Sequence, residues 1–551
     1  MHLRLWARLS LPLLYPLNLA TAQDPLEDDT GLSSFVTRPD LRAPKLAVRV
    51  VNKTAVSPGY HFVAPYNTNN DWDSHKTPLV EACQVGPHIY DNNGELVWSG
   101  ACLFRNENGF DFKAIHYDNK TFLSLDNVRG DPSLYGAGII LSDQYKIVKD
   151  VQMAEHTNQF DQHEFAVFED GKSALYSTSD LRDMDGDSIG LGRNSQTRVH
   201  STGFKVVDIS GENPKTVFDW QGADHVPLEE STFAWPEEPD PYGKGWDYLH
   251  MNSVDKFPNG DYLVSFRYTN SLMRLSGGNG HVLWRLGGKR SDFDTKGFVF
   301  SRQHHGRIIT SNETHTVLSF FDNASSSQNS DKGITTADRS SAYVIQLSHD
   351  PNDRGSWTAT PLRHFERPDW GYTRLRGSIQ ILPSSESSSL EHDTTDGWKN
   401  SNAFVSWSDH GYATEFSPSG DVVMETQFVS RRFDTYRAFK MVGFVGRPTE
   451  PPALKALVYG DILPGQGSPV GPFTVVYISW NGATEVRAWR IYGKIPRSTR
   501  FAYLGTYRKT GFETAITIPG AMSYLWAEAL DSEGNKIGQS SVARGIVPGV
   551  S

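Results

Sequence analysis

Residues 246–267 read WDYLHMNSVDKFPNGDYLVSFR. Apolar and polar residues alternate, a Pro-Asn-Gly-Asp turn interrupts them, and the alternation then resumes, which is typical of a β-hairpin. The first strand starts with an aromatic cluster around His250, where a strand that only packs would more simply carry Val or Ile. The hairpin therefore predicts an architecture, and its first residues are candidates for function.

Similar hairpins recur along the chain, and each is followed by a strand that closes a unit. The hairpins cover residues 112–126, 163–179, 250–266, 304–321 and 376–409, and closing strands include GELVWSG (94–100), GHVLWRLGG (280–288) and GDVVMETQF (420–428). Four-stranded units at periods of roughly 50–85 residues are typical of a β-propeller. With the unit before Cys102 we expect six blades, and YRAFKMVGF (436–444) is expected to return and close the ring.

The two ends of the chain have a different character. The N-terminus has Arg4 and Arg8, then a short Leu-rich run and Ala20-Thr21-Ala22, which predicts a signal peptide over 1–22. We expect the mature chain to enter the secretory pathway and to be secreted or held in a vesicle lumen. The propeller is predicted over 23–450. After the Pro-rich stretch 447–454, short alternating strands predict an immunoglobulin- or fibronectin-like β-sandwich over 455–551. The fold class is all-β.

Composition narrows the list of partners. The 551 residues carry a formal net charge of -11 without a Lys/Arg block, which argues against nucleic acid. No later apolar run is long enough for a stable membrane span. In an oxidising compartment Cys83 and Cys102 are expected to form a disulfide, the alternative being a reactive thiol pair. Four sequons predict glycosylation, at Asn52, Asn119, Asn312 and Asn323.

The first strand of every propeller blade lines the central channel, so residues at blade starts converge. Imidazole and guanidinium groups there suit an anionic or polarised oxygen. We predict four catalytic residues, namely His250, His304, Arg307 and Arg376. We also predict eight substrate-binding residues, namely His163, Trp246, Asn252, Gln303, Arg374, Trp407, His410 and Tyr412. The alternative for any single histidine is a hydrogen-bonded core residue.

Metal binding is a weaker interpretation. Three imidazoles suit zinc, with Asp161, Glu164 and Asp247 as carboxylates behind them, but no spacing enforces ligand distances. The stretch DLRDMDGDSIG (180–190) lacks the turn glycine and closing glutamate of a calcium loop and is predicted to be a solvated acidic turn. No nucleophile elbow, Walker loop or HExxH motif occurs, and scattered carboxylates do not motivate a glycosidase. We expect neither a metal nor another cofactor.

Several motifs together resemble the fungal arylsulfotransferase-like family from about residue 45 to the end. They are DQHEF (161–165), WDYLHMNSVD (246–255), GHVLWRLGG (280–288), QHHGR (303–307), GSIQILP (377–383) and YISWNGATEVRAWRIYG (477–493). The resemblance implies a six-bladed propeller with a sandwich-like segment after it. In bacterial relatives it implies sulfuryl transfer between phenols without a nucleotide donor, with one histidine as carrier and other His and Arg residues on the sulfuryl oxygens.

Here His250 and His304 lie in matching motifs, whereas the blade that starts near Arg376 has no histidine, and His410 is the nearest substitute. Fungal members also include tropolone–sesquiterpenoid hetero-Diels–Alderase-type proteins, which need no nucleophile. We therefore hypothesise a natural-product enzyme that catalyses cycloaddition or cyclisation of an aromatic or phenolic small molecule through polarising hydrogen bonds. The alternatives are a nucleotide-independent aryl sulfotransferase with a sulfuryl-histidine intermediate, and a non-catalytic secreted binding propeller.

Overall fold

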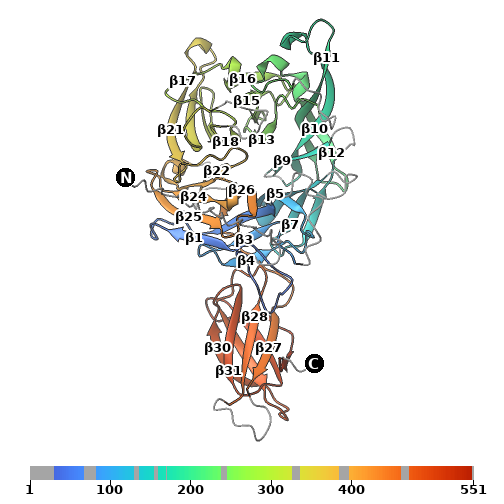
Figure 1. The fold of residues 1–551 in the computed structure, drawn as a ribbon, viewed down its shortest axis with the longest axis vertical. Coiled ribbons are helices and arrows are strands. Elements are labelled where there is room, and N and C mark those ends of the chain that lie inside the picture. Colours follow the sequence, from blue (N-terminus) through green and yellow to red (C-terminus); the bar gives the residue numbers. More distant parts are fainter. Residues whose placement is uncertain are drawn as a thin grey trace, which may run out of the picture. The chain divides into compact units, whose positions relative to one another are not determined.

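The computed structural model describes residues 30–67, 82–128, 136–153, 159–168, 171–236, 245–325, 335–383, 396–460 and 471–548 (Figure 1). The signal peptide predicted over 1–22 lies outside these ranges. Within them, strands predominate, and none of the helical turns has the length and apolarity that a membrane crossing requires. These turns are η2 (Asp187–Ile189), η3 (Gly222–Asp224), η4 (Leu228–Glu230), η5 (Gly288–Arg290), η6 (Arg354–Ser356), η7 (Asp396–Asn400) and η8 (Asp409–Gly411).

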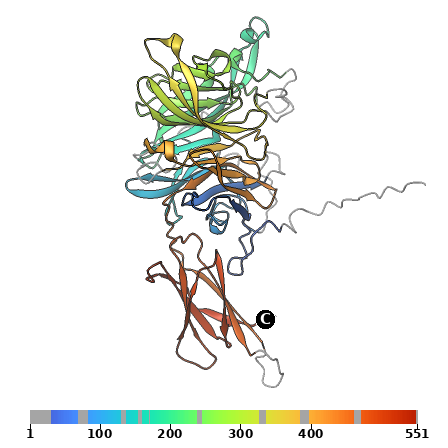
Figure 2. The ribbon, with the colours of Figure 1, turned by 90° about the vertical axis from the view of Figure 1, so that its left-hand side faces the viewer.

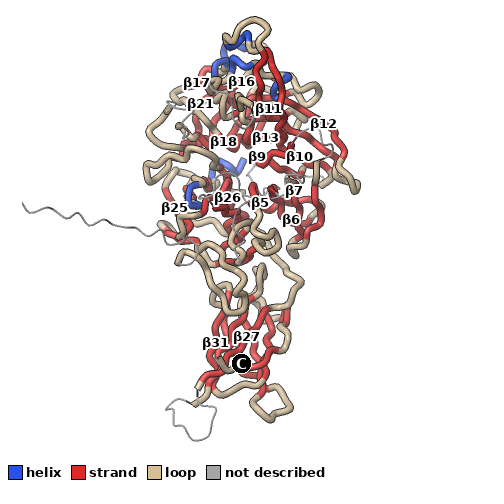
Figure 3. The backbone as a smooth tube through the Cα atoms, turned by 45° about the vertical axis from the view of Figure 1, so that its right-hand side comes forward, coloured by secondary structure: helices blue, strands red, loops and turns tan. Residues whose placement is uncertain are grey.

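Six sheets, each with four antiparallel strands at its centre, form a six-bladed β-propeller, as the repeats predicted (Figures 1 and 3). From the innermost strand outward, the first three blades are β26 (Phe433–Met441), β2 (Tyr60–Asn67), β3 (His88–Tyr90) and β4 (Leu96–Ser99); β5 (Asn108–Tyr117), β6 (Lys120–Val128), β7 (Ala137–Ser142) and β8 (Ile147–Val151); and β9 (Gln159–Val167), β10 (Ser173–Asp185), β11 (Gln196–Asp208) and β12 (Lys215–Gln221).

The next three blades are β13 (Met251–Lys256), β14 (Tyr262–Phe266), β15 (Ser271–Leu275) and β16 (Val282–Gly287); β18 (His304–Ser311), β19 (His315–Asp322), β20 (Ser341–Ser348) and β21 (Thr358–Glu366); and β22 (Ser378–Ile381), β23 (Ala403–Ser406), β24 (Ala413–Phe416) and β25 (Val422–Phe428). Two short strands extend blades at their outer edge: β17 (Asp294–Thr295) pairs with β21, and β1 (Leu46–Val50) pairs with β25.

The ring is closed by a strand from the far end of the propeller sequence. Strand β26 pairs antiparallel with β2, with Tyr60 opposite Met441, and becomes the innermost strand of the first blade. This confirms the predicted return of the segment 436–444. Closure pairs a strand edge that would otherwise stay open.

Irregular backbone recurs where the innermost strands begin. Pairing shifts register between Phe110 and Lys113 in β5, between Met251 and Ser253 in β13, and between His304 and Arg307 in β18. Such bulges re-aim side chains and are frequent beside functional sites. Four non-glycine residues at blade starts also have positive φ: Asp111 (51°), His250 (54°), His305 (54°) and Arg376 (66°). The backbone there is held in a sparsely populated conformation, as is common at functional sites.

Apolar side chains fill the space between the sheets. In one such layer, Phe204 lies between Trp220 and Tyr262, with ring centroids 5.9 Å and 5.0 Å away. The predicted disulfide is confirmed: Cys83 and Cys102 are bonded, with 5.1 Å between their Cα atoms, and they bracket the β3–β4 hairpin.

The C-terminal strands differ from the prediction of a two-sheet sandwich (Figure 2). They are β27 (Ala453–Tyr459), β28 (Phe473–Ser479), β29 (Ala488–Lys494), β30 (Ala502–Arg508), β31 (Glu513–Pro519), β32 (Tyr524–Leu530), β33 (Lys536–Gln539) and β34 (Ala543–Ile546). Strand β34 pairs parallel with β27 and antiparallel with β32, and so joins what would be two sheets into one mixed eight-stranded sheet that is nearly closed like a barrel. The short alternating strands were predictable, whereas the joining strand was not.

Candidate functional site

Two histidines at the innermost strands of neighbouring blades are in contact. His163 lies in β9, and His250 lies immediately before β13. Their rings pack edge to face with 4.8 Å between the centroids. Each ring has its own carboxylate at Nδ1: His163 is hydrogen-bonded to Asp161, and His250 Nδ1 lies 2.5 Å from Asp247 Oδ2. The structure thus contains two Asp–His pairs side by side.

The carboxylates fix the tautomer of both rings. A carboxylate only accepts hydrogen bonds, so Nδ1 of each imidazole donates and Nε2 carries the lone pair in the neutral ring. Among the described residues, neither Nε2 of His163 nor Nε2 of His250 has a hydrogen-bond partner. The side chains are 10% and 25% exposed. Nε2 of each ring is therefore a candidate atom for contact with a ligand.

Charge and burial set the protonation of these pairs. Burial tends to raise the pKa of Asp161, but the charge and hydrogen bond of His163 outweigh it and bring the pKa to about 2. Burial and His250 act on Asp247 in the same opposed way, and its pKa is also lowered. Burial lowers the pKa of His250 against the pull of Asp247. The carboxylates are ionised and His250 is a neutral imidazole near neutral pH.

His304 is close by but differs in its contacts. Its Nδ1 lies 2.7 Å from Asn323 Oδ1 and 2.9 Å from the Arg302 carbonyl, and its Nε2 accepts a 3.3 Å hydrogen bond from the Arg376 backbone N–H. Burial, and then the charge of Arg267, keep the pKa of His304 well below its usual value. Both nitrogens are occupied, so this predicted catalytic residue holds the turn before β22 in place.

Asn323 is part of the same arrangement, and its surroundings argue against the predicted glycosylation. The side chain is fully buried. Its Nδ2 donates to the carbonyls of Thr373 (2.6 Å) and Arg376 (2.9 Å), so the folded protein does not present this nitrogen. Asn52, Asn119 and Asn312 are exposed, and their glycosylation remains a prediction.

Asp434 contacts two further residues of the predicted site, Arg376 and His410. Arg376 Nη1 lies 2.9 Å from Asp434 Oδ2, and the guanidinium lies over the Tyr66 ring. The backbone N–H of His410 donates to Asp434 Oδ1 at 2.8 Å, and the His410 side chain is 38% exposed. Arg374 is exposed, and its carbonyl accepts a 3.1 Å hydrogen bond from Arg267 Nη1. Arg376 adjoins His304 through its backbone, whereas Arg374 points to solvent.

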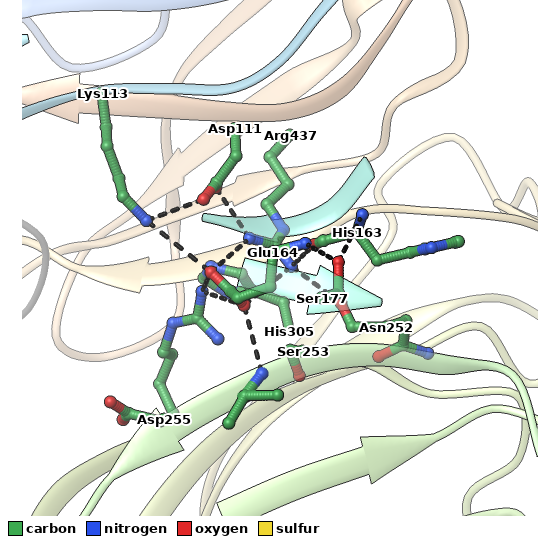
Figure 4. Close-up of polar contacts among 12 residues, drawn as sticks. Asp111, Lys113, His163, Glu164, Ser177, Asn252, Ser253, Asp255, His305 and Arg437 are labelled. Atoms are coloured by element: carbon green, nitrogen blue, oxygen red, sulfur yellow. Dashed lines mark hydrogen bonds and ion pairs between the residues drawn. The ribbon is translucent and has the colours of Figure 1, made fainter. Parts of the chain in front are cut away.

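Arg307 was predicted to be catalytic, but it pairs with Glu164 in a buried ion network. Four members of this network, Asp111, Lys113, Glu164 and Arg437, are labelled in Figure 4. Arg307 Nη2 lies 3.0 Å and 2.9 Å from the two oxygens of Glu164. Arg437 contacts the same carboxylate and also Asp111, at 2.7 Å, and Lys113 pairs with Asp111 at 2.9 Å. All five side chains are buried. The charge of Arg307 is therefore paired with Glu164 inside this network.

Arg437 ties this network to the Asp–His pairs. Its Nη2 donates to the carbonyls of His163 (2.9 Å) and Asn252 (2.8 Å), one on β9 and one on β13. Burial opposes the charge, but Asp111 and Glu164 outweigh it and hold the pKa of Arg437 well above its usual value. The guanidinium thus clamps the two strands that carry the histidines.

The remaining predicted residues are buried in packing roles. Gln303 donates to Ser265 and to two backbone carbonyls, and Asn252 Nδ2 donates to the Gln303 carbonyl at 2.7 Å. Trp407 donates to Thr414, and the Tyr412 hydroxyl donates to Glu425. Trp246 is 4% exposed and packs beside Tyr248. The large aromatic side chains among these predicted substrate-binding residues pack in the hydrophobic core.

Tyr436 was missed. Its ring lies edge-on to His163, with 5.8 Å between centroids, and 6.5 Å from His304. Tyr268 adjoins the other side of the pair, 5.1 Å from His250, and stacks on Phe233. The available signal for Tyr436 was its position near the start of the closing strand, which is equivalent to the other blade starts. In the described ranges, no three His, Cys, Asp or Glu side chains form a group that can hold a metal ion.

Comparisons with solved structures give low similarity. A protein of unknown function from Bacteroides caccae is 9% identical, with a TM-score of 0.33, over 70% of this chain and 100% of that one. AztD from Citrobacter koseri is 10% identical, with a TM-score of 0.25, over 71% of this chain and 100% of that one. These values carry no argument about function. No curated protein matches.

A family model gives a clear result. Residues 128–429, more than half of the chain, match the model described as arylsulfotransferase (ASST). The matched range includes both Asp–His pairs as well as His304 and Arg376. The chain therefore belongs to the arylsulfotransferase (ASST) family.

Proposed function

We propose that this protein is an arylsulfotransferase-type enzyme that moves a sulfuryl group from an aryl sulfate to a phenol at His163 and His250. One observation carries the proposal: two imidazoles, each oriented by a carboxylate at Nδ1, meet with 4.8 Å between their centroids. One such ring can act as a nucleophile while the other moves a proton. Family membership supports the same class of reaction.

In the first half-reaction, Nε2 of neutral His250 attacks the sulfur, and the bond from sulfur to the aryl oxygen breaks. Protonated His163 gives its Nε2 proton to the departing oxygen, so that a phenol leaves. The sulfuryl group remains on His250, whose ring becomes cationic. Asp247 compensates that charge, because its carboxylate accepts the Nδ1 hydrogen bond.

The second half-reaction reverses these roles. Neutral His163 takes the proton of the acceptor phenol, whose oxygen attacks the sulfur, and the bond from nitrogen to sulfur breaks. The products are a new aryl sulfate, free His250 and protonated His163. Atoms and electrons balance without a nucleotide or an oxidant.

His250 is the better carrier of the two. It is the more exposed ring, and burial keeps it neutral and therefore nucleophilic. His304 has both nitrogens occupied. Cationic groups nearby favour an anionic substrate. Burial lowers the pKa of His250 most, Asp247 raises it, and the charge of Arg267 is among the smaller effects that lower it. Arg376 has a buried Nε without a partner among the described residues.

The test is turnover with para-nitrophenyl sulfate as donor and phenol as acceptor. The wild type is expected to release para-nitrophenol and form phenyl sulfate, and His250→Gln and His163→Gln are expected to abolish both. His281→Gln changes an exposed histidine and serves as the matched control. No transfer by the wild type, or full transfer by His250→Gln, would contradict the proposal.

A second candidate is cycloaddition or cyclisation of an oxygenated aromatic or polyketide-type substrate. It is favoured by the blade that begins near Arg376 without a histidine, and by the Tyr436 hydroxyl, a buried donor that has no partner in the described chain. Such a site polarises an oxygen and forms no bond to the protein. Conversion of a diene substrate by His250→Gln at the wild-type rate would favour it. Binding of phenols without any turnover would favour a non-catalytic propeller.

We also propose that the chain enters the secretory pathway. The disulfide between Cys83 and Cys102 fits an oxidising compartment. N-terminal sequencing of the mature protein is expected to begin at Gln23, and a mature chain that retains Met1 would contradict this.

A further inference from the structure

We propose that the hydroxyl of Tyr436 is a binding group for the reacting oxygen of the substrate, a hydrogen-bond donor whose acceptor the ligand supplies. The inference deepens the proposed function, since it places a phenolic or aryl ester oxygen between Tyr436 and His163. It makes Tyr436 a catalytic residue.

The ring of Tyr436 is held by its neighbours. His163 and His304 meet it at interplanar angles of 77° and 73°. Phe110 packs against it at 89°, with 5.9 Å between centroids, and the guanidinium of Arg437 lies 5.3 Å from the ring centroid. A ring held by two histidines, a phenylalanine and an arginine has one orientation. The direction of its hydroxyl is therefore fixed before any ligand binds.

The hydroxyl itself is an exception in this fold. Tyr436 is 3% exposed, and in the described part of the chain no other tyrosine hydroxyl is buried without a hydrogen-bond partner. Other buried tyrosines donate to backbone carbonyls: Tyr90 to Pro44, Tyr145 to Gly482 and Tyr248 to Val226. Burying a hydroxyl without a partner lowers stability, and phenylalanine would fill the same space without that loss. Local rules of this kind are most often broken at functional sites.

The surroundings decide that the hydroxyl donates. Burial raises the pKa of Tyr436, the charge of Arg437 opposes this, and the carboxylates of Asp161, Glu164 and Asp111 raise it further. The phenol therefore keeps its proton at physiological pH and can donate a hydrogen bond to an acceptor. An oxygen that exchanges a proton with His163 develops negative charge as the bond to sulfur breaks, and a fixed donor beside it stabilises that charge.

The experiment compares Tyr436→Phe with Tyr90→Phe. Tyr90 is equally buried, but its hydroxyl donates to the Pro44 carbonyl. Three quantities are measured for each variant: the thermal midpoint (Tm), the Kd of para-nitrophenol, and kcat and KM for sulfuryl transfer. Tyr436→Phe is expected to keep or raise Tm while it weakens para-nitrophenol binding and kcat/KM by roughly 10- to 100-fold. Tyr90→Phe is expected to lower Tm and leave Kd unchanged.

Three results would overturn the inference: an unchanged Kd and kcat/KM in Tyr436→Phe, a fall in Tm as large as that of Tyr90→Phe, or no para-nitrophenol binding by the wild type. Failure of the proposed function gives a different result. In that case the wild type binds para-nitrophenol and Tyr436→Phe loses this binding, but no sulfuryl transfer occurs, and the assignment of Tyr436 as a ligand-binding donor holds.

Discussion

The rings of His163 and His250 meet edge to face, 4.8 Å apart, although one lies in β9 and the other immediately before β13. Each blade delivers one imidazole together with the aspartate that orients it. The pairing depends on the angle between adjacent blades, so the propeller ring itself sets the distance between the two imidazoles. This relationship connects the fold to the proposed chemistry.

The Asp247 carboxylate is expected to matter through the tautomer of His250. Asp247→Asn replaces an acceptor with a group that can also donate, so the His250 ring can turn its lone pair away from the substrate. We expect kcat to fall by about 100-fold or more. Asp187→Asn in the exposed turn of η2 is the matched control and should keep full activity. Equal activity in both variants would argue against an orienting role for Asp247.

The Arg437 clamp is expected to dominate local stability. Arg437→Met leaves Glu164 and Asp111 buried with less neutralisation, so the free energy of unfolding should fall by about 3–5 kcal/mol. Lys296→Met removes the exposed ion pair with Asp294 and should cost about 1 kcal/mol or less. Urea denaturation measures both. Similar losses of unfolding free energy in the two variants would show that the buried network does not stabilise the fold more than an exposed ion pair does.

Acid is expected to destabilise the protein through buried histidines. Burial holds the pKa of His61 at about 3 and that of His88 at about 4, and keeps the pKa of His304 well below its usual value. Below about pH 6.5 these histidines are protonated in the unfolded chain but stay neutral in the folded protein. The free energy of unfolding therefore falls as pH falls. Each histidine contributes up to about 1.4 kcal/mol per pH unit until its folded pKa is reached.

The measurement is the free energy of unfolding from about pH 7.5 to about pH 5. His88→Gln should reduce the slope of this free energy against pH by the contribution of one histidine. His281→Gln changes an exposed histidine and should leave the slope unchanged. A stability that stays constant over this range would contradict the assignment of neutral buried histidines.

Glycan mapping tests the role of Asn323. In protein made through a eukaryotic secretory pathway, peptides with Asn52, Asn119 and Asn312 can carry glycans because these side chains are exposed. The peptide with Asn323 should carry none, because its Nδ2 is buried and donates two hydrogen bonds. A glycan on Asn323 in the folded protein would contradict the described surroundings of His304.

The propeller was predictable because its evidence is periodic. Alternating strands, acidic or glycine turns and a closing segment each recur, and even the return of 436–444 followed from the need to pair an edge. The arrangement of the C-terminal strands was harder to predict from the sequence. Its strands alternate as in a sandwich, but one short strand, β34, decides that they form one sheet, and four residues carry no signal for two partners.

The place where the candidate residues meet was predictable, whereas their individual contacts were predictable only in part. Convergence of blade starts correctly brought His163, His250 and His304 together. Sequence could not show that Arg307 pairs with Glu164, because a buried cation and a cation facing a substrate have the same local pattern. Tyr436 was missed because an aromatic residue at a strand start is usually core. The difference lies in its unpartnered hydroxyl, which only three-dimensional contacts reveal.

The most direct test of the central claim is the mass of the protein after mixing with para-nitrophenyl sulfate in the absence of an acceptor. The account predicts a gain of one sulfuryl group, located on His250 by fragmentation and lost when phenol is added. Steady sulfuryl transfer without any adduct, or an adduct on His304 or His410, would contradict it.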